Sequence, residues 1–351
     1  MSLEIYPEGF HTRYEISHAI SVSMSINYND VGKIQLVVPA SDYNIMALKN
    51  NAIIFDTDKN TTYVIVNTKC DTNENRITAN GYTAEYILNK RCVSVKRQIT
   101  NIEAGVYGLI TDNLRSLPRV RIAPSKGYTE TFQLDDKTTE DVDESVVIGG
   151  QLLDEIKKVL EYGELGRRMN WDSSSLSWEF EVFKGDDLTH GIHRVAFVEE
   201  QGTCSNLVIN DDISPFKNVA YIEYEYNKVK KIVSVGNAVG NDRYEKWLNS
   251  SVTNEDGESE SATKNRALAN ATMELAKYNK RTNFSVTIAP EEFNVRFSLG
   301  DIVSCVSNRF GVSFDARITG IKYTLDSTGE RTEIILGEPT LTALGEMILN
   351  G

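Results

Sequence analysis

The chain has 351 residues, enough for about two or three domains that each bury a core of their own. Hydrophobic residues make up 40% of it and charged residues 25%, proportions that exclude a wholly disordered or a fibrous chain. Its formal net charge of −13 argues against a protein that wraps nucleic acid, because that binding needs Lys and Arg to displace the counterions of the phosphates.

The first hundred residues are patterned mainly as β-strands. Residues 20–28 alternate apolar side chains with Ser and Asn, which predicts a half-buried strand. Further strand-like runs follow at 34–38, 53–55, 63–67 and 76–79. Asp58, Lys59 and Asn60 lie between two of these runs and predict a hairpin turn.

Helical spacing of apolar residues comes next. One helix is predicted over 102–114 and a second, clearer one over 148–160. Gly163 follows the second helix, where a left-handed cap is needed, and Ser145 is suited to cap its start. The two-residue period of a strand then resumes at 178–182.

Residues 221–235 are β-rich and predict a long hairpin. Its first strand has two different faces, one with Ile222, Tyr224 and Tyr226 and the other with Tyr221, Glu223 and Glu225. The polar segment 254–263 predicts an exposed loop that leads into a helix.

The apolar stripe of that helix is narrow and consists of Leu268, Ala271, Leu275 and Tyr278. After Pro290 the chain returns to strands, and residues 326–329 predict a turn between two of them.

Neither a secretion signal nor a membrane-spanning helix is predicted. Residues 1–10 contain no basic cluster, and no run of about eighteen apolar residues occurs without a charge. We therefore expect a protein that is soluble when made. The cysteines, Cys70, Cys92, Cys204 and Cys305, lack the paired spacing of zinc or redox motifs, so we expect reduced thiols that are mostly buried.

Two groups of residues deserve consideration as metal ligands. His190 and His193 have a spacing that holds a metal on a helix, but Gly191 between them favours a loop, and no Glu follows His190 as in metalloproteases. An acidic run lacks the spacing of a calcium loop and consists of Asp135, Asp136, Glu140, Asp141, Asp143 and Glu144. A solvated loop is the better interpretation of both.

A calcium loop is also suggested weakly by Asn254, Asp256 and Gly257. The position five residues before Gly257 is Val252, whose side chain has no oxygen to bind the ion. We therefore expect no metal site and no cofactor.

Catalytic motifs are missing from the sequence. It contains four histidines, no Gly-x-Ser-x-Gly elbow and no phosphate-binding glycine loop. Paired carboxylates abound in an acidic chain, which leaves a glycosidase open without singling out a pair. We expect no enzyme and no catalytic residue.

Tyr221, Tyr224 and Tyr226 offer a possible stacking platform for sugars or bases. The alternative is a sheet face buried against a domain or a neighbouring subunit. We favour burial, because Glu223 and Glu225 are interleaved where a nucleic-acid groove needs cations.

The order of several short segments resembles the hub proteins of phage tails, namely the amino-terminal hub module of siphophage tail-associated proteins and the baseplate hubs of contractile phages. The segments are 81–91 (GYTAEYILNKR), 150–156 (GQLLDEI), 165–166 (LG), 183–187 (FKGDD), 195–197 (VAF) and 216–219 (FKNV). A final block follows at 299–303 (LGDIV), 310–312 (FGV), 315–319 (DARIT) and 335–337 (ILG). In it Gly300 supplies a turn and Asp301 is suited to bond nearby backbone.

The resemblance implies a mainly β fold with a few α-helices, built from two β-barrel-like tube domains of discontinuous segments and a small peripheral α/β domain. The first tube-like domain is expected over 1–100 plus 196–226 and the second over 101–195 plus 290–345. The peripheral domain is expected over 227–289, with a helix at 263–280.

The implied function is that of a structural hub subunit in a phage or prophage tail tip or baseplate. Three copies would form a ring that joins the tail tube to the tip and surrounds the DNA exit channel, without specific nucleic-acid binding. The implied partners are the tail tube, the distal tail protein and tip or fibre proteins. The chain would be made in the bacterial cytoplasm and end in the virion.

Candidate contact segments for this ring are 221–235 and 263–278. Because the chain ends at Gly351, soon after the final block, we do not expect the lytic activity of longer relatives. The alternatives from other classes are a cell-wall or polysaccharide hydrolase, which needs a cleft with two carboxylates, and a carbohydrate-binding receptor module, which needs exposed coplanar aromatic rings.

Overall fold

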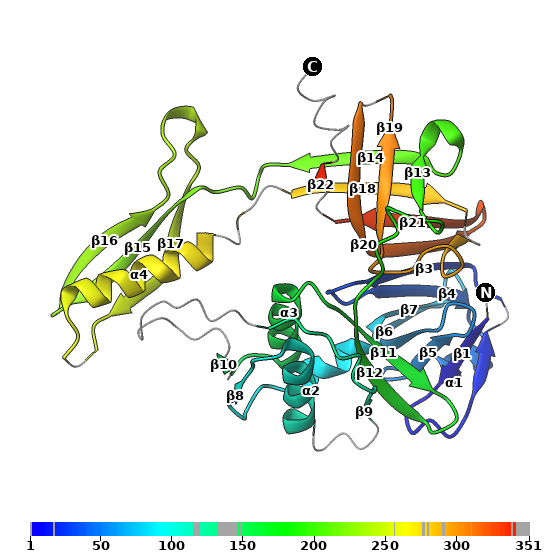
Figure 1. The fold of residues 1–351 in the computed structure, drawn as a ribbon. Coiled ribbons are helices and arrows are strands. Elements are labelled where there is room, and N and C mark those ends of the chain that lie inside the picture. Colours follow the sequence, from blue (N-terminus) through cyan, green and yellow to red (C-terminus); the bar gives the residue numbers. More distant parts are fainter. Residues whose placement is uncertain are drawn as a thin grey trace. The chain divides into compact units, whose positions relative to one another are not determined.

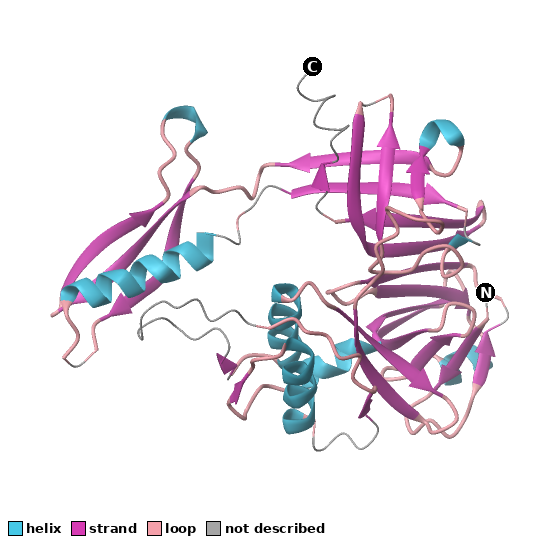
Figure 2. Ribbon diagram, in the orientation of Figure 1, coloured by secondary structure: helices cyan, strands magenta, loops and turns pink. Residues whose placement is uncertain are grey.

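A computed structural model describes residues 2–16, 18–114, 120–131, 146–147, 149–255, 257–275, 278, 281–289, 292–309, 311–337 and 340–341. It divides into two compact units. Unit 1 consists of Met1–Phe132, Ser145–Val208 and Phe284–Gly351, and unit 2 consists of Gln133–Glu144 and Ile209–Asn283. The mainly β fold class with a few helices is confirmed (Figures 1 and 2).

A 14-stranded sheet is the framework of unit 1 in the described part of the chain. Its path runs through β14 (Ser205–Asp212), β18 (Arg281–Ile288), β21 (Gly329–Leu336), β20 (Val312–Asp326), β3 (Ser21–Asn27), β4 (Lys33–Pro39), β7 (Arg76–Thr83), β6 (Thr61–Asp71), β5 (Ile53–Asp56), β1 (Leu3–Tyr6) and β2 (Tyr14–Ile16). Beside this path, β19 (Ile302–Ser307) pairs with β13 (Ala196–Val198) and β20, which also pairs with β22 (Thr340–Leu341). The path has two ends, so the described strands form no closed barrel.

Strand β20 joins segments from opposite ends of the chain. Its second half pairs with β3, so that Tyr323 lies opposite Met24, and its first half pairs with β19. A register shift between Ile318 and Gly320 separates the two halves, as expected where a strand bends from one set of partners to another. The framework therefore combines residues about three hundred positions apart in sequence.

The predicted hairpin turns are confirmed at both positions. In the first, the side chain of Asp56 accepts hydrogen bonds from the backbone N–H groups of Asp58 and Lys59, at 3.0 and 3.1 Å. In the second, Asp326 pairs with Gly329 and accepts a bond of 2.8 Å from the N–H of Thr328. Short acidic side chains favour such turns because they satisfy backbone donors that the strands leave unpaired.

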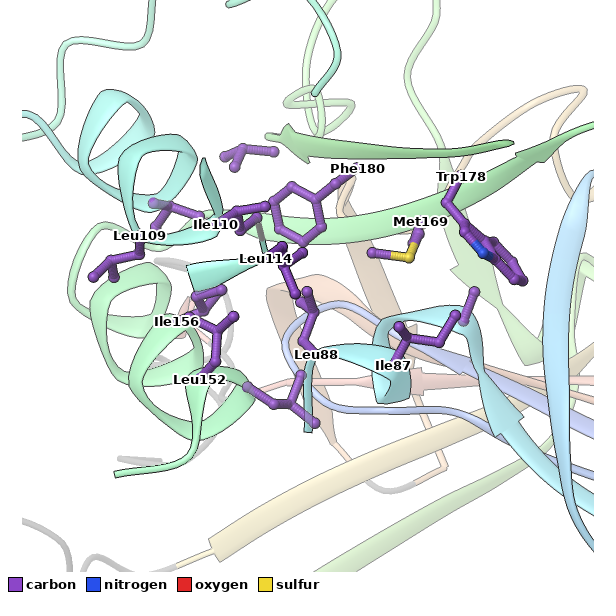
Figure 3. Packing of buried hydrophobic residues seen from close by; sticks show 14 of the residues in the cluster. Ile87, Leu88, Leu109, Ile110, Leu114, Leu152, Ile156, Met169, Trp178 and Phe180 are labelled. Atoms are coloured by element: carbon purple, nitrogen blue, oxygen red, sulfur yellow. The ribbon is translucent and has the colours of Figure 1, made fainter. Parts of the chain in front are cut away.

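A helical layer packs beside this framework around a second core (Figure 3). It contains α2 (Ile102–Asn113), α3 (Leu152–Tyr162), the 3₁₀ helix η1 (Ala84–Lys90), the pair β8 (Arg97–Gln98) and β10 (Val146–Val147), and the sheet of β11 (Gly166–Asp172), β12 (Ser177–Phe183) and β9 (Val120–Ile122). Apolar side chains of both α-helices meet Phe180 and Met169 of the small sheet. Smaller elements of unit 1 are α1 (Asp42–Ala47) and the 3₁₀ helix η2 (Glu199–Gln201).

The prediction of the α2 helix is confirmed, and that of α3 needs two corrections. Helix α3 begins at Leu152, four residues later than expected, while Ser145 and Ile148 lie outside the described residues. Gly163 caps its end with a φ of −91°, so it is not left-handed, whereas Glu164 has a φ of 51°. A Cβ at position 163 would lie 2.6 Å from Cδ1 of Ile102, so a larger residue there would require the end of that side chain to move.

Unit 2 is a three-stranded sheet covered by one helix. Its strands lie in the order β16 (Val229–Val235), β15 (Val219–Tyr226) and β17 (Glu245–Thr253), with α4 (Glu260–Leu275) and the 3₁₀ helix η3 (Gly240–Asp242) as its helices. The predicted hairpin of β15 and β16 is confirmed, and it turns at Asn227 and Lys228, which both have positive φ. Strand β17 runs parallel to β15.

The buried stripe of α4 differs from the predicted one. Thr263, Ala267 and Ala271 are fully buried, with Leu275 partly so, whereas Leu268 is only half-buried. The small side chains at this spacing of four let the helix approach the sheet closely. The helix also begins at Glu260, so the expected loop 254–263 is shorter, and the chain returns to a strand at Arg281 rather than after Pro290.

The expected domain boundaries stay a prediction. Strand β15, which was expected in the first tube-like domain, is the central strand of unit 2. Ala220, Ile222 and Tyr224 of this strand complete the core beneath α4.

The cysteines are free thiols, as expected, but only Cys204 and Cys305 are buried, whereas Cys70 and Cys92 are exposed. Burial raises the pKa of Cys204 to about 11 and that of Cys305 to about 12. In the described part of the chain, no helix is long and apolar enough to cross a membrane.

We expect Cys70 and Cys92 to react promptly with a chromogenic disulfide reagent in the native protein, and Cys204 and Cys305 to react only after unfolding. The reason is that the thiolate is the nucleophile and that a buried thiol with a raised pKa provides little of it. Thiol release with and without urea measures both pairs. A Cys70→Ser, Cys92→Ser variant should lack the prompt reaction, and prompt reaction of all four native thiols would contradict the assignment.

Candidate functional site

The two histidines considered as metal ligands lie in an exposed loop of unit 1 rather than on a helix. Nδ1 of His190 lies 2.5 Å from Oγ1 of Thr189. This ring nitrogen therefore already has a hydrogen-bond partner. Among the residues that the structure describes, no group of three or more His, Cys, Asp or Glu is placed to hold a metal ion. The absence of a metal site stays a prediction.

The acidic run at 135–144 and Asp256 lie outside the described residues. Val252 is buried in the core of unit 2, where it packs with Ala267 and Ala271 of α4.

One face of the unit 2 sheet packs against α4 and forms the core, and the opposite face lies outside this core. Because side chains alternate along a strand, Ile222 and Tyr224 face α4 whereas Tyr221 points to the opposite side. The pairing of β15 with its neighbours places Ile232 and Trp247 on that same side. Ile232 is 58% exposed and Trp247 is 48% exposed, and we call Tyr221, Ile232 and Trp247 the open face.

The aromatic rings of the open face are held in a row. Tyr221 and Trp247 lie opposite one another on β15 and β17, with ring centres 6.5 Å apart and planes inclined by 21°. The Arg243 guanidinium lies 5.8 Å from the centre of the Tyr221 ring and donates a hydrogen bond of 2.8 Å to its hydroxyl. These contacts hold the two rings in place and give the Tyr221 hydroxyl a hydrogen-bond partner.

The three tyrosines of β15 therefore do not form one platform. Tyr224 is buried and donates through its hydroxyl to Glu260 of α4 at 3.2 Å, and Tyr226 packs partly against the same core. The helix segment expected as a contact surface likewise uses its buried stripe to cover the sheet. Sequence reasoning missed Trp247, because its neighbour Tyr221 is 26 positions away and no local period links them.

Helix α1 of unit 1 exposes a second group of apolar side chains. Ser41 caps its start by accepting a hydrogen bond from the N–H of Asn44. Tyr43, Ile45 and Met46 are 45%, 47% and 50% exposed, and we call them the α1 patch. Tyr43 is fixed by its ring contact with Tyr14, at 5.0 Å between centres, and by a hydrogen bond of 2.9 Å from the N–H of Glu15. Tyr43 and Met46 are three positions apart and share one face of the helix, whereas Ile45 lies on another.

The motif around Gly300 builds a buried corner of unit 1. The Asp301 carboxylate accepts hydrogen bonds from the N–H groups of Asp186 and Ser298, at 2.8 and 2.7 Å. Arg317 donates a bond of 2.7 Å to the Gly300 carbonyl. Gly300 itself has a φ of +96°, where other residues are strained.

Tyr28 extends this corner to two other segments. The Arg317 guanidinium lies 5.2 Å from the centre of the Tyr28 ring. The Tyr28 hydroxyl donates a hydrogen bond of 2.9 Å to the carbonyl of Glu164, and burial raises its pKa to about 12, so it stays protonated. Tyr28, Asp301 and Arg317 thus join parts of the chain that are far apart in sequence.

Comparison with known proteins agrees with this architecture. The family described as Siphovirus ReqiPepy6 Gp37-like protein matches residues 2–338. No curated protein matches the chain significantly.

The solved structures that resemble it include three tail proteins. The tail protein from Neisseria meningitidis MC58 is 10% identical with a TM-score of 0.57, covering 96% of each chain. The 43 kDa tail protein of prophage MuSo2 from Shewanella oneidensis is 9% identical with a TM-score of 0.56, covering 96% of this chain and 98% of that one. Prophage tail protein gp18 from Listeria monocytogenes EGD-e is 13% identical with a TM-score of 0.50, covering 100% of both.

At such identities the structural likeness shows the fold alone, and the family match carries the assignment. The expected resemblance to phage tail proteins is confirmed by both comparisons. Because the match extends over almost its whole length, the chain belongs to the Siphovirus ReqiPepy6 Gp37-like family of phage tail proteins.

Proposed function

We propose that the chain is a non-enzymatic hub subunit of a phage tail tip or baseplate, three copies of which form a ring. The ring joins the tail tube to the tip and surrounds the DNA exit channel. The observation that carries this proposal is the tail-protein family match over residues 2–338. The net charge of −13 suits a channel that repels DNA rather than one that holds it.

Ring formation needs two different complementary surfaces on each subunit. We assign these roles to the α1 patch in unit 1 and the open face in unit 2, since both hold large exposed apolar side chains on regular secondary structure. Both also differ from scattered surface residues because ring contacts and hydrogen bonds hold Tyr43 and Tyr221 in place. The expected two tube-like domains and the contacts with tail tube, distal tail, tip or fibre proteins belong to the same proposal.

The proposal is tested by the solution mass of the purified chain, measured by light scattering over a concentration series. We expect a species of three times the 39.3 kDa chain mass. A strictly monomeric mass at every concentration would contradict a ring formed by this chain alone.

Variants locate the surface that the ring uses. Ile232→Ser with Trp247→Ser should weaken self-association at least about tenfold, because each large apolar side chain contributes about 1.5–3 kcal/mol when buried. Val229→Ser is the matched control, since Val229 is 54% exposed but lies at a β16 position that alternates toward the α4 side. Equal weakening by the control would mean that the open face is not the contact.

A carbohydrate-binding module is a second candidate that one observation favours. Trp247 is half-exposed beside Tyr221 with nearly parallel rings, an arrangement on which a sugar ring can stack. Glycan binding that disappears in Trp247→Ser while the mass of the assembly is unchanged would support this candidate over the hub proposal.

A further inference from the structure

Strand β16 is a free edge of the unit 2 sheet. It is the outer strand in the order β16, β15, β17, and no described strand pairs with its other side (Figure 1). All seven of its residues are matched to β15 without a register shift, so the edge is regular over its whole length. A regular, unpaired edge presents a row of backbone N–H and C=O groups to which another strand can add.

The hairpin determines which backbone groups of β16 are free. Its two-residue turn makes Tyr226 and Val229 a hydrogen-bonded pair, and every second pair of the antiparallel ladder then exchanges hydrogen bonds. The carbonyl of Glu225 agrees with this alternation, because it accepts a hydrogen bond on the β17 side, from the N–H of Asn254. The residues of β16 that direct their N–H and C=O groups away from β15 are therefore Lys230, Ile232 and Ser234.

The lysines of β16 do not guard this edge. Charged side chains that project across an edge normally prevent a second strand from adding. Nζ of Lys230 instead lies 2.6 Å from Oε1 of Glu223 on β15. Nζ of Lys231 lies 2.5 Å from Oε1 of Glu260 on α4. Both ion pairs draw the lysine side chains back over their own sheet, whereas the apolar side chain of Ile232 at the edge is 58% exposed.

The opposite edge of the sheet is less suited to pairing. Strand β17 has a register shift against β15 between Tyr221 and Glu223, where residues 248–250 are set against a single residue of β15. Such a bulge bends a strand and interrupts the row of backbone groups at its edge. The regular edge of β16 is therefore the one at which the sheet of unit 2 can be extended.

We propose that β16 pairs with β16 of a second copy of the chain, antiparallel and centred on Ile232, so that two three-stranded sheets become one continuous sheet. The pairs across the junction are then Ile232 with Ile232, Lys230 with Ser234, and Lys231 with Val233. Every outward-facing residue meets an outward-facing residue, and each such pair exchanges both of its N–H···O=C bonds. The edge is thus complementary to itself.

The charges of β16 select this register. A shift of the second strand by two residues would place the two copies of Lys231 opposite each other, and a shift by four would do the same for Lys230. Like charges directly opposite one another are destabilising. A shift by two residues in the other direction would set Lys230 against Gly236, which lies beyond the end of the strand, and would lose a pair of backbone bonds.

This contact is separate from the ring and goes beyond the proposed function. It joins chains in pairs about a two-fold axis, whereas a ring of three needs two different surfaces on each chain. Where both contacts form, a ring would pair with a second ring at high protein concentration. The two-fold axis is perpendicular to the joined sheet, so the open faces of both copies lie on the same side of it.

The experiment is oxidative cross-linking of the full chain through a cysteine at position 232. Ile232→Cys is combined with Cys70→Ser and Cys92→Ser, which remove the exposed native thiols. The Cα atoms of a hydrogen-bonded antiparallel pair lie about 5.5 Å apart, a separation that a disulfide can span. We expect a disulfide-linked dimer on a non-reducing gel after mild oxidation.

Val229→Cys in the same background is the matched control, because Val229 is 54% exposed and lies on the same strand. In the proposed register Val229 faces Val235, so its own counterpart is six residues along the strand, about 20 Å away. This control should give no dimer at the same protein concentration. Equal cross-linking of the two cysteine variants, or no dimer from Ile232→Cys, would overturn the proposal.

Two substitutions at Ser234 distinguish strand pairing from chance collision. Ser234→Pro removes an outward N–H for which the described part of the chain has no acceptor, so the fold should be kept and the link through Ile232→Cys lost. Ser234→Lys keeps the backbone and sets a charge opposite Lys230 of the second copy, so it should reduce the link at low salt and restore it at high salt. It decides the test if the proline variant does not fold.

Cross-linking that folded variants of both kinds leave unchanged would refute the pairing. The ring is judged separately, by the solution mass. A three-chain mass without the link at position 232 would overturn this inference and leave the ring intact, whereas the link with a two-chain mass would support this inference alone.

Discussion

Replacing Glu103 by alanine should lower the free energy of unfolding of the chain by about 3 kcal/mol or more. Glu103 is buried in the first turn of α2, and its carboxylate accepts four hydrogen bonds from the loop that follows β9. The donors are the Ser125 hydroxyl and the N–H groups of Lys126, Gly127 and Tyr128, at 2.9, 2.6, 3.0 and 3.0 Å. Bonds to a charged group contribute about 1.5–3 kcal/mol each and are not additive.

Urea unfolding of wild type and variant measures this loss as a shift of the midpoint. Glu130→Ala is the control, because Glu130 forms an ion pair with Lys184, whose side chain is 40% exposed. A pair of this kind contributes about 1 kcal/mol or less. Glu103→Gln should fall between the two, since it keeps an acceptor and loses the charge. Similar midpoints for the Glu103 and Glu130 alanine variants would show that the loop does not depend on the carboxylate.

Replacing Gly185 by alanine should be as damaging, by a different mechanism. A Cβ at this position would lie 2.0 Å from the carbonyl carbon of Gly300, 2.1 Å from its oxygen and 2.3 Å from the N–H nitrogen of Asp301. These are backbone atoms in the buried corner that Asp301 and Arg317 hold by hydrogen bonds, so they cannot move aside cheaply. We expect a loss of about 3 kcal/mol or more, at the upper end of the effects of overpacking.

The thermal unfolding midpoint and the soluble yield measure the effect. Gly191→Ala is the matched control in the same region of the chain, because a Cβ there would meet nothing within 4 Å. Gly191 has a φ of +80°, so its replacement should cost only about 1–2 kcal/mol of backbone strain. Equal stability of the two variants would mean that the corner around Gly300 is not closely packed.

Part of the proposed contact surface, namely the two faces of β15, could be predicted from the sequence. The residues that join Tyr221 on the open face could not. The two faces of β15 follow from the alternation of Tyr221 and Ile222, which the chain geometry of a strand imposes. Trp247 and Ile232 join Tyr221 only through strand pairing. The α1 patch had no signal, because a six-residue helix is too short for a helical period to be read.

The sequence by itself determined the elements whose cause is local. Alternation over 20–28, helical spacing over 102–114 and short acidic residues at the two hairpin turns each act within a few positions, where covalent geometry restricts the choices. The order of short segments also sufficed to identify a phage tail protein, since the family match spans the same stretch of chain.

Only the tertiary structure decided which distant segments meet. The pairing of β3 with β20, the stripe of α4 that is buried and the burial of Arg167 depend on the sum of all contacts in the folded chain. Glu103 and Gly185 look like ordinary surface and turn residues in the sequence, and their importance arises from backbone groups that folding brings within bonding or contact distance. A local pattern fixes which way a side chain points, whereas what it meets is set by packing across the whole domain.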